Sequence, residues 1–217
     1  MLTRIDHVTI GAADLAAGIA AYRRIGFDVD EGGVARTDGD YLELVRGDGW
    51  QSIALASDDL AADSARGSVD YIRLVKPRNA PAGRHPNGVQ RIERVYIAVT
   101  DLAAAVEKYS RALGLPAPKR ERGTVIHADM AIFQLGPTGL GLAQPVAPGV
   151  AADALARRGP GPFQILYRTS SMDAAAKWIA DHGLPPPARG IRNTGEQAML
   201  VMPEYACGAY VGFVGMA

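Results

Sequence analysis

The sequence contains almost no cysteine, no long apolar stretch and no excess of either charge. Cys207 is the only cysteine among 217 residues, which excludes an internal disulfide and any metal site built from several cysteines. No histidine lies near it in EYACGAY, so a buried thiol is favoured over a nucleophile. No stretch approaches about 18 consecutive apolar residues, and this excludes a transmembrane helix.

Charge is balanced, with 23 basic and 23 acidic residues and no long run of one sign. Such a chain lacks the broad electrostatic field that gathers nucleic acid or an anionic membrane. A small-molecule or protein partner remains, and we expect a small-molecule substrate. The first residues, MLTRIDHVTI, enter a strand-like pattern without the apolar stretch of a signal peptide, so we expect a cytoplasmic protein.

One layout occurs four times along the chain: a short alternating strand, a helix cap and an alanine-rich helix. An internal repeat of this kind indicates the architecture of the whole chain, which single residues do not. The four segments are HVTIGAADLAAGIAAYRRIGF from His7, SIALASDDLAADSARG from Ser52, RVYIAVTDLAAAVEKYSRALGL from Arg94 and QILYRTSSMDAAAKWIADHGL from Gln164.

A polar residue before each helix and a glycine after it predict where the helices begin and end. The polar side chains can accept hydrogen bonds from the unpaired N–H groups of the first helical turn. The predicted N-caps are Asp14, Asp59, Asp101 and Ser171, and the predicted terminating glycines are Gly26, Gly67, Gly114 and Gly183.

Each repeat closes on a second alternating strand. The closing strands read YLELV, YIRLV, GLGLA and YVGFV, with Glu43, Arg73, Gly141 and Gly212 at their centres. The second repeat has room for only a strand, a helix and a strand. The others can hold two more strands, which in the first repeat are expected at Phe27 to Val29 and Val34 to Thr37. Either the second repeat has lost its middle strands or its closing strand is wrongly matched.

Two segments rich in proline and glycine divide the repeats. KPRNAPAGRHPNGVQ, residues 76–90, predicts a linker between two halves, so we expect domains at residues 1–80 and 90–217. QPVAPGVAADALARRGPGP separates the third and fourth repeats, with a short helix expected at Ala151 to Arg158.

The β-α-β-β-β layout that opens IDHVTI…ADL and closes YLELV resembles the vicinal oxygen chelate superfamily. That superfamily includes glyoxalase I, methylmalonyl-CoA epimerase, extradiol dioxygenases, and the fosfomycin and bleomycin resistance proteins. The resemblance covers nearly the whole chain and is closest at residues 1–47 and 91–217. It implies an α+β fold in which repeated units pair into curved mixed sheets with helices outside. It also implies a cleft in which residues of the opening and closing strands hold a metal ion.

Carried over by position, the family's metal ligands fall on few suitable side chains. The first pair of repeats offers His7, Glu43, Ser52 and Arg73, and the second offers Arg94, Gly141, Gln164 and Gly212. Only His7 and Glu43 are ordinary ligands in the first pair, and only Gln164 is suitable in the second. We therefore expect at most one divalent ion in the N-terminal half, on His7 and Glu43, and none in the C-terminal half.

Three interpretations of the first pair stay open. His7 and Glu43 hold a metal ion, with Glu43 also the candidate catalytic base. Alternatively, no metal is bound and Arg73 pairs with Glu43 or binds a ligand carboxylate through its planar fork. In the third interpretation His7 is a core histidine and the ion pair is structural. We favour a contact between Arg73 and Glu43, because two protein ligands hold a divalent ion weakly.

The second half carries further candidates for ligand binding. Arg94 lies at an inward position of its strand, and a buried guanidinium needs an acceptor. That acceptor is either a bound anion or a salt bridge to Glu121 or Asp129. Gln164 at the opening position of the fourth repeat is a second candidate.

Tyr96 and Tyr210 alternate in register with the inward positions of the second half. They either line the same cleft as Arg94 or pack as ordinary strand aromatics.

The expected function is that of a glyoxalase-like protein that binds a small organic substrate, with metal-assisted isomerase, lyase or dioxygenase-type chemistry. The alternative is a metal-free protein of the bleomycin-resistance type that sequesters a small molecule. Whether the protein is an enzyme, and whether it forms a homodimer, stays open.

Overall fold

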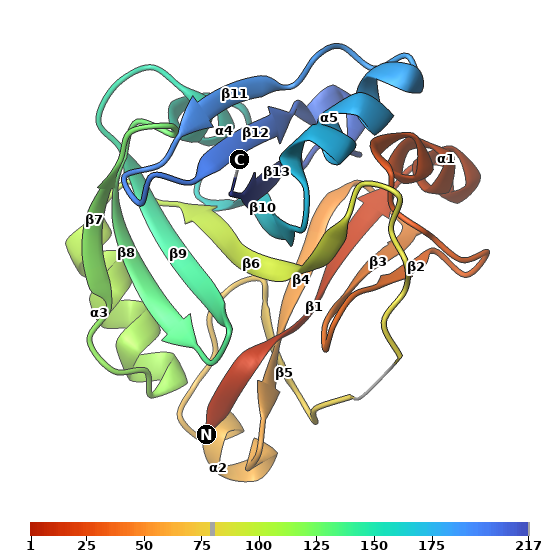
Figure 1. Cartoon of the computed structure of the whole chain (residues 1–217). Helices are drawn as coiled ribbons and strands as arrows, with labels where there is room; N and C mark the ends of the chain where they lie inside the picture. The colour runs from red at the N-terminus through yellow and green to blue at the C-terminus, as the bar shows by residue number, and fades with distance from the viewer. Residues whose placement is uncertain (79–80, 217) are drawn as a thin grey trace.

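The computed structural model describes residues 1–78 and 81–216 (Figure 1). The first sheet and its helices comprise β1 (Leu2–Ala12), α1 (Leu15–Ile25), β2 (Val34–Arg36), β3 (Tyr41–Arg46), β4 (Gly49–Ser57), α2 (Leu60–Ser64) and β5 (Ile72–Val75). The remaining elements are β6 (Val89–Ala98), α3 (Leu102–Leu113), β7 (Lys119–Gly123), β8 (Ala128–Leu135), β9 (Thr138–Pro145), α4 (Val150–Arg158), β10 (Gly161–Thr169), α5 (Met172–Asp181), β11 (Ala188–Ile191), β12 (Gln197–Val201), the 3-10 helix η1 (Pro203–Tyr205) and β13 (Tyr210–Gly215). The α+β fold expected from the sequence is confirmed.

The first two repeats share a five-stranded sheet with the order β2-β3-β1-β4-β5. β1 runs antiparallel to β4 and parallel to β3, so the opening strands of the two repeats lie side by side. Within the part of the chain that the structure describes, the second repeat has no strand between α2 and β5. Its middle strands are therefore missing, and the closing strand was matched correctly.

The first repeat is also shorter than expected, because the segment from Phe27 to Val29 is not a strand. The ring of Phe27 is fully buried and packs edge-on against Tyr167, with 4.9 Å between the ring centroids. The segment that was expected to pair within the first sheet instead places this ring against the second sheet.

The last two repeats share an eight-stranded sheet with the order β11-β12-β13-β10-β6-β9-β8-β7. Both are complete, with a strand, a helix and three further strands each. β6 and β10 are antiparallel neighbours at its centre, which repeats the arrangement of β1 and β4 in the first sheet. The expected short helix between these repeats is α4.

The helix caps agree with the sequence at all four N-termini. The side chains of Asp14, Asp59, Asp101 and Ser171 accept hydrogen bonds from the backbone N–H three residues later. Gly26 and Gly114 end α1 and α3 in left-handed conformations. The other two helices stop earlier than expected, at Ala65 and His182.

The two sheets share one apolar core under the helices. It includes strand residues of both sheets together with residues of α1, α3 and α5. α1 and α5 lie side by side (Figure 1), and Arg24 on α1 donates to the carbonyls of His182 and Gly183 at the end of α5. No helix among residues 1–78 and 81–216 is long and apolar enough to span a membrane.

The segment between the halves lacks helix and strand from Lys76 to Gly88, apart from Asn79 and Ala80, which lie outside the described residues. It is nevertheless attached to the core at His85, whose Nδ1 accepts from the N–H of Asp28 at 2.9 Å. The side chain of Asn87 is completely buried and donates to the carbonyl of Ile25. The expected linker is thus partly built into the core.

Candidate functional site

Each sheet presents one face to the shared core and an opposite, inner face. The alternation along β6 shows the division, because Val95 and Ile97 belong to the shared core, whereas Tyr96 belongs to a smaller separate apolar cluster. We call the inner face of the second sheet the second cup. The corresponding face of the first sheet, which carries His7 and Glu43, is called the first cup.

Two glycines allow long side chains to lie flat inside the second cup. A Cβ atom at Gly141 would lie 2.7 Å from Cδ1 of Tyr96, and one at Gly212 would lie 2.7 Å from Nε2 of Gln164. Real Cβ contacts are essentially never this short. Glycine at each closing position therefore leaves room for the side chain of Tyr96 or Gln164. A metal-ligating side chain at Gly141 or Gly212 would fit only if Tyr96 or Gln164 moved.

Arg94 forms a salt bridge with Glu121 in the second cup. Its guanidinium donates to Oε1 of Glu121 at 2.9 Å and to the hydroxyl of Tyr96 at 3.0 Å. Burial by itself would lower the pKa of Arg94, but Tyr96 and Glu121 raise it above its ordinary value. Of the two carboxylates weighed from the sequence, Glu121 is the partner, because Asp129 pairs with Arg122.

Besides the Tyr210 hydroxyl, two polar atoms of the second cup are buried without a hydrogen-bond partner among the described residues. They are Nε of Arg94 and Oε1 of Gln164. Gln164 is 5% exposed, and its side-chain amide forms no hydrogen bond with any residue that the structure describes. An unpaired buried polar group costs about 1–3 kcal/mol, so such groups call for an external partner.

A cavity of about 60 Å³ lies beside Gln164, Tyr96 and Leu166. Its mouth is bridged by side chains from two loops. Thr124, between β7 and β8, donates to Oδ1 of Asn193 at 3.1 Å, and Nδ2 of Asn193 donates to the carbonyl of Arg122. Thr124 and Asn193 were missed in the sequence, where the only signal was the turn-forming run Asn-Thr-Gly.

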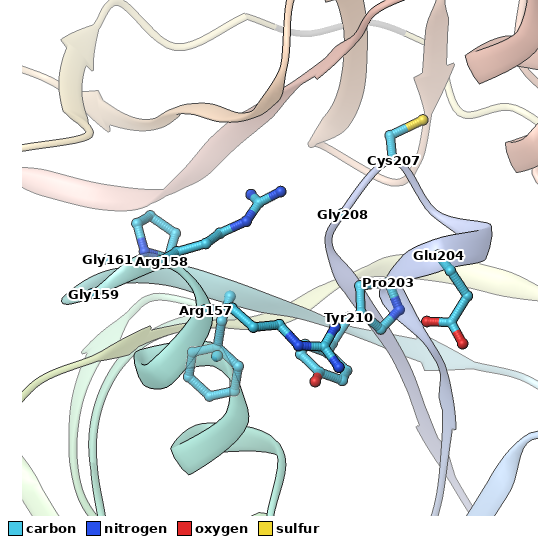
Figure 2. Close-up of a pocket in the computed structure, with 12 residues that line it drawn as sticks. Arg157, Arg158, Gly159, Gly161, Pro203, Glu204, Cys207, Gly208 and Tyr210 are labelled. Atoms are coloured by element: carbon cyan, nitrogen blue, oxygen red, sulfur yellow. The ribbon is translucent and has the colours of Figure 1, made fainter.

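Tyr210 lies in a different cavity from Tyr96 and Gln164. It pairs with Gln164 in the register of β10 and β13, yet its ring lines a larger space of about 330 Å³ near the end of α4 (Figure 2). Phe163 stands between the two tyrosines, with its ring centroid 6.2 Å from that of Tyr96 and 6.3 Å from that of Tyr210. The single cleft expected for both tyrosines is therefore divided.

His7 is held by a carboxylate and an aromatic ring in the first cup. Its Nδ1 lies 2.8 Å from Oδ1 of Asp6, and its ring stacks on Tyr41 with 4.4 Å between centroids. Burial by itself would raise the pKa of Asp6, but hydrogen bonds from His7 and from the N–H of Arg78 lower it below its ordinary value. Because Asp6 is then an ionised acceptor, Nδ1 of His7 donates in this hydrogen bond, and Nε2 lies outside it.

Glu43 lies on the same face as His7 but does not contact Arg73. In the register of β1 and β3 it pairs with Thr9, whose hydroxyl donates to Oε2 of Glu43 at 3.2 Å. Arg73 is exposed on β5, and β1 and β4 lie between β5 and β3. Two intervening strands separate the backbones by about 14 Å. The favoured ion pair between Arg73 and Glu43 is therefore wrong.

The side chains of the first cup do not complete a metal site. His7 offers Nε2 and Glu43 offers its carboxylate, whereas a zinc site normally uses at least three protein ligands. Nowhere among the described residues are three His, Cys, Asp or Glu side chains gathered closely enough to hold a metal ion. The donor set therefore does not fit the metal that the resemblance implied.

Sequence comparison places the second half of the chain among known proteins. The profile of the glyoxalase/bleomycin resistance protein/dioxygenase superfamily matches residues 93–201. None of the curated proteins matches the chain in sequence.

Solved structures agree with this match. The methylmalonyl-CoA epimerase from Mycobacterium tuberculosis is 25% identical, with a TM-score of 0.53 over 60% of this chain and 90% of that one. A variant of the Streptomyces coelicolor epimerase in complex with 2-nitronate-propionyl-CoA is 26% identical, with a TM-score of 0.52 over 59% of this chain and 99% of that one. A mutant of 4-hydroxymandelate synthase from Streptomyces coelicolor shares the fold over 100% of this chain and 94% of that one, with a TM-score of 0.72 at 14% identity.

Proposed function

Since the chain belongs to the glyoxalase/bleomycin resistance protein/dioxygenase superfamily, we propose that its second cup binds a small organic molecule without a metal ion. The observation that carries the proposal is the unpartnered buried Oε1 of Gln164, which lines the cavity. A ligand that carries a hydrogen-bond donor satisfies this atom. Tyr96 supplies an aromatic wall.

The size of the cavity limits the ligand. About 60 Å³ holds a few non-hydrogen atoms, since one water needs about 10–15 Å³ measured in the same way. A larger ligand requires the bridge between Thr124 and Asn193 to open. Binding with sequestration agrees with this geometry, because two loops joined by hydrogen bonds close over the bound molecule.

The proposal is tested by ligand-observed NMR with acetamide as the probe. We expect acetamide, which both donates and accepts, to bind wild type and to bind Gln164→Met at least tenfold more weakly. Gln90→Met is the control, because Gln90 is exposed at the start of β6. Without ligand, Gln164→Met should unfold at a higher temperature, since it removes an unpaired buried amide. Equal binding by Gln164→Met and wild type contradicts the proposal.

Proton transfer in the first cup is the second candidate function. It is favoured by the hydrogen bond between Asp6 and His7, which leaves Nε2 of His7 free to accept a proton. Glu43 is the alternative base at the same face, as expected from its position on the closing strand. The two epimerases that resemble this chain make a proton at a carbon next to a carbonyl the natural target for such a base.

The second candidate is tested with methylmalonyl-CoA in D₂O, by following exchange of its C2 proton with NMR. If the proposal holds, wild type accelerates exchange, and His7→Gln and Glu43→Gln show which residue is the base. His182→Gln serves as the control, since His182 is exposed at the end of α5. If the C2 proton exchanges no faster with wild type than in buffer alone, the chain does not catalyse proton transfer on methylmalonyl-CoA.

Four further expectations stay proposals. Residues 1–80 and 90–217 are proposed to be two glyoxalase-like domains, one for each sheet. Arg73 is proposed to contact ligand from the exposed edge of the first sheet. The cytoplasmic location and a homodimer are expected from the sequence and stay predictions.

A further inference from the structure

A second cavity shares no lining residue with the cavity beside Gln164. It has a volume of about 330 Å³ and is formed by the end of α4, the start of β10 and the turn between η1 and β13 (Figure 2). Its apolar walls include Ala154, Phe163 and Pro203. Small-molecule sites begin at about this volume, so the space accommodates an organic molecule rather than a lone ion.

The cavity has an excess of positive charge. Arg157 and Arg158 end α4 and both line the space, where the one carboxylate among the lining residues is Glu204. Neither arginine forms an ion pair with any residue in the described ranges 1–78 and 81–216. Basic residues at a helix C-terminus complement the helix dipole, which accounts for two arginines in the last turn of α4. The dipole does not account for both side chains lining the cavity.

Arg158 occupies a slot formed by two glycines. A Cβ at Gly49 would collide with one terminal guanidinium nitrogen of Arg158, and a Cβ at Gly208 would collide with the other. Gly49 belongs to the first sheet and Gly208 to the turn before β13. The guanidinium therefore lies close to the backbone of Gly49 and Gly208, at the end of an exposed side chain.

The hydroxyl of Tyr210 is a further polar group available to a ligand. Tyr210 is 3% exposed and lines the cavity, yet its hydroxyl has no hydrogen-bond partner among the described residues. Burial raises its pKa above the ordinary value, whereas the nearby charge of Arg157 acts in the opposite direction. The phenol therefore stays protonated at neutral pH and can donate a hydrogen bond. In Figure 2 the side chain of Arg157 runs toward its ring.

We infer that this cavity binds an organic anion, with a carboxylate or phosphate group held by Arg157 and the Tyr210 hydroxyl and an apolar body against Phe163 and Pro203. Two donors of this kind match the acceptor-only oxygens of such a group. Arg158 lines the same cavity and adds positive charge. Glu204 repels a second negative charge, which favours a monoanion. The site does not include Gln164 or Arg94 and is separate from the proposed function of the second cup.

Benzoate is the probe, titrated into the full chain at low ionic strength and followed by ligand-observed NMR. We expect saturable binding, with benzamide, its neutral analogue, at least tenfold weaker. Arg157→Gln should weaken benzoate binding at least fivefold, and Arg84→Gln, which removes an exposed arginine elsewhere, should leave it unchanged. Competition by inorganic phosphate shows that the site accepts any oxyanion. Failure to compete shows that a carboxylate on an apolar body is required.

Tyr210→Phe keeps the ring and removes only the unpaired hydroxyl. We expect its unfolding temperature without benzoate to rise and its benzoate affinity to fall at least threefold. A lower unfolding temperature would mean that the hydroxyl has a structural partner, and it would overturn the inference. Equal affinities for benzoate and benzamide, or an Arg157→Gln variant that binds as wild type does, would also overturn it.

Discussion

The amide nitrogen of Gln164 lies 2.7 Å from the point where a Cβ atom at Gly212 would stand. The opening strand of the fourth repeat thus fills the space that its closing strand leaves empty. The same relationship holds between Tyr96 and Gly141 in the third repeat. In the second cup, a glycine on each closing strand therefore leaves room for a long polar side chain on the opening strand.

Gly212→Ala tests this relationship directly. We expect it to lower the free energy of unfolding by about 1–3 kcal/mol, because Gln164 and Leu166 must move to admit the methyl group. Chemical denaturation measures the effect. Gly32→Ala is the matched control, since Gly32 is exposed and the one atom near a Cβ there, Oδ1 of Asp30, lies 3.3 Å away. A Gly212→Ala variant as stable as wild type contradicts the account.

Asp40 should make stability depend on pH. It is 5% exposed and accepts hydrogen bonds from Thr37 and from the N–H of Ile92, which joins the first sheet to β6. Burial raises its pKa from 3.8 to about 7, although these hydrogen bonds act to lower it. The folded chain then binds the proton more tightly than the unfolded chain does.

The resulting stabilisation is complete below about pH 4 and is lost as the pH rises to about 7. We expect wild type to lose about 2–4 kcal/mol over this window relative to Asp40→Asn. Urea denaturation of both proteins between pH 4 and pH 8 measures the difference. Parallel pH profiles would show that Asp40 keeps an ordinary pKa in the folded chain.

Divalent metal ions should bind weakly. His7 and Glu43 are two donors where a zinc site needs at least three, and the second cup has glycines at both closing positions. Isothermal titration with zinc and nickel should therefore give no sub-micromolar binding. Tight binding that disappears in His7→Ala would instead establish the metal site expected from the resemblance.

Asn193→Ala should loosen the mouth of the second cup. It removes both hydrogen bonds that join the loop after β11 to the loop after β7. We expect backbone amides near Thr124 and Asn193 to exchange with deuterium several-fold faster, with little change in global stability, because both residues are exposed. Thr124→Val breaks one of the two bonds and should have a smaller effect. Unchanged exchange in Asn193→Ala means that the bridge does not close the cavity.

The sequence by itself determined the local structure. Asp14, Asp59, Asp101 and Ser171 cap their helices as predicted, because a cap depends on residues three positions apart. The repeat of strand, helix and strand, with its resemblance to one superfamily, established the α+β fold. Alternation placed Tyr96 and Gln164 on the inner face, since every second residue of a strand points the same way.

Only the tertiary structure decided which of these side chains meet. Arg73 and Glu43 occupy equivalent positions in their repeats, yet the strand order separates them by two strands. Tyr210 and Tyr96 alternate in register, but Phe163 stands between them and divides the space. The unpaired atoms of Gln164, Arg94 and Tyr210 are also invisible in the sequence. Whether a polar group finds a partner depends on contacts between distant segments, and local spacing does not determine those contacts.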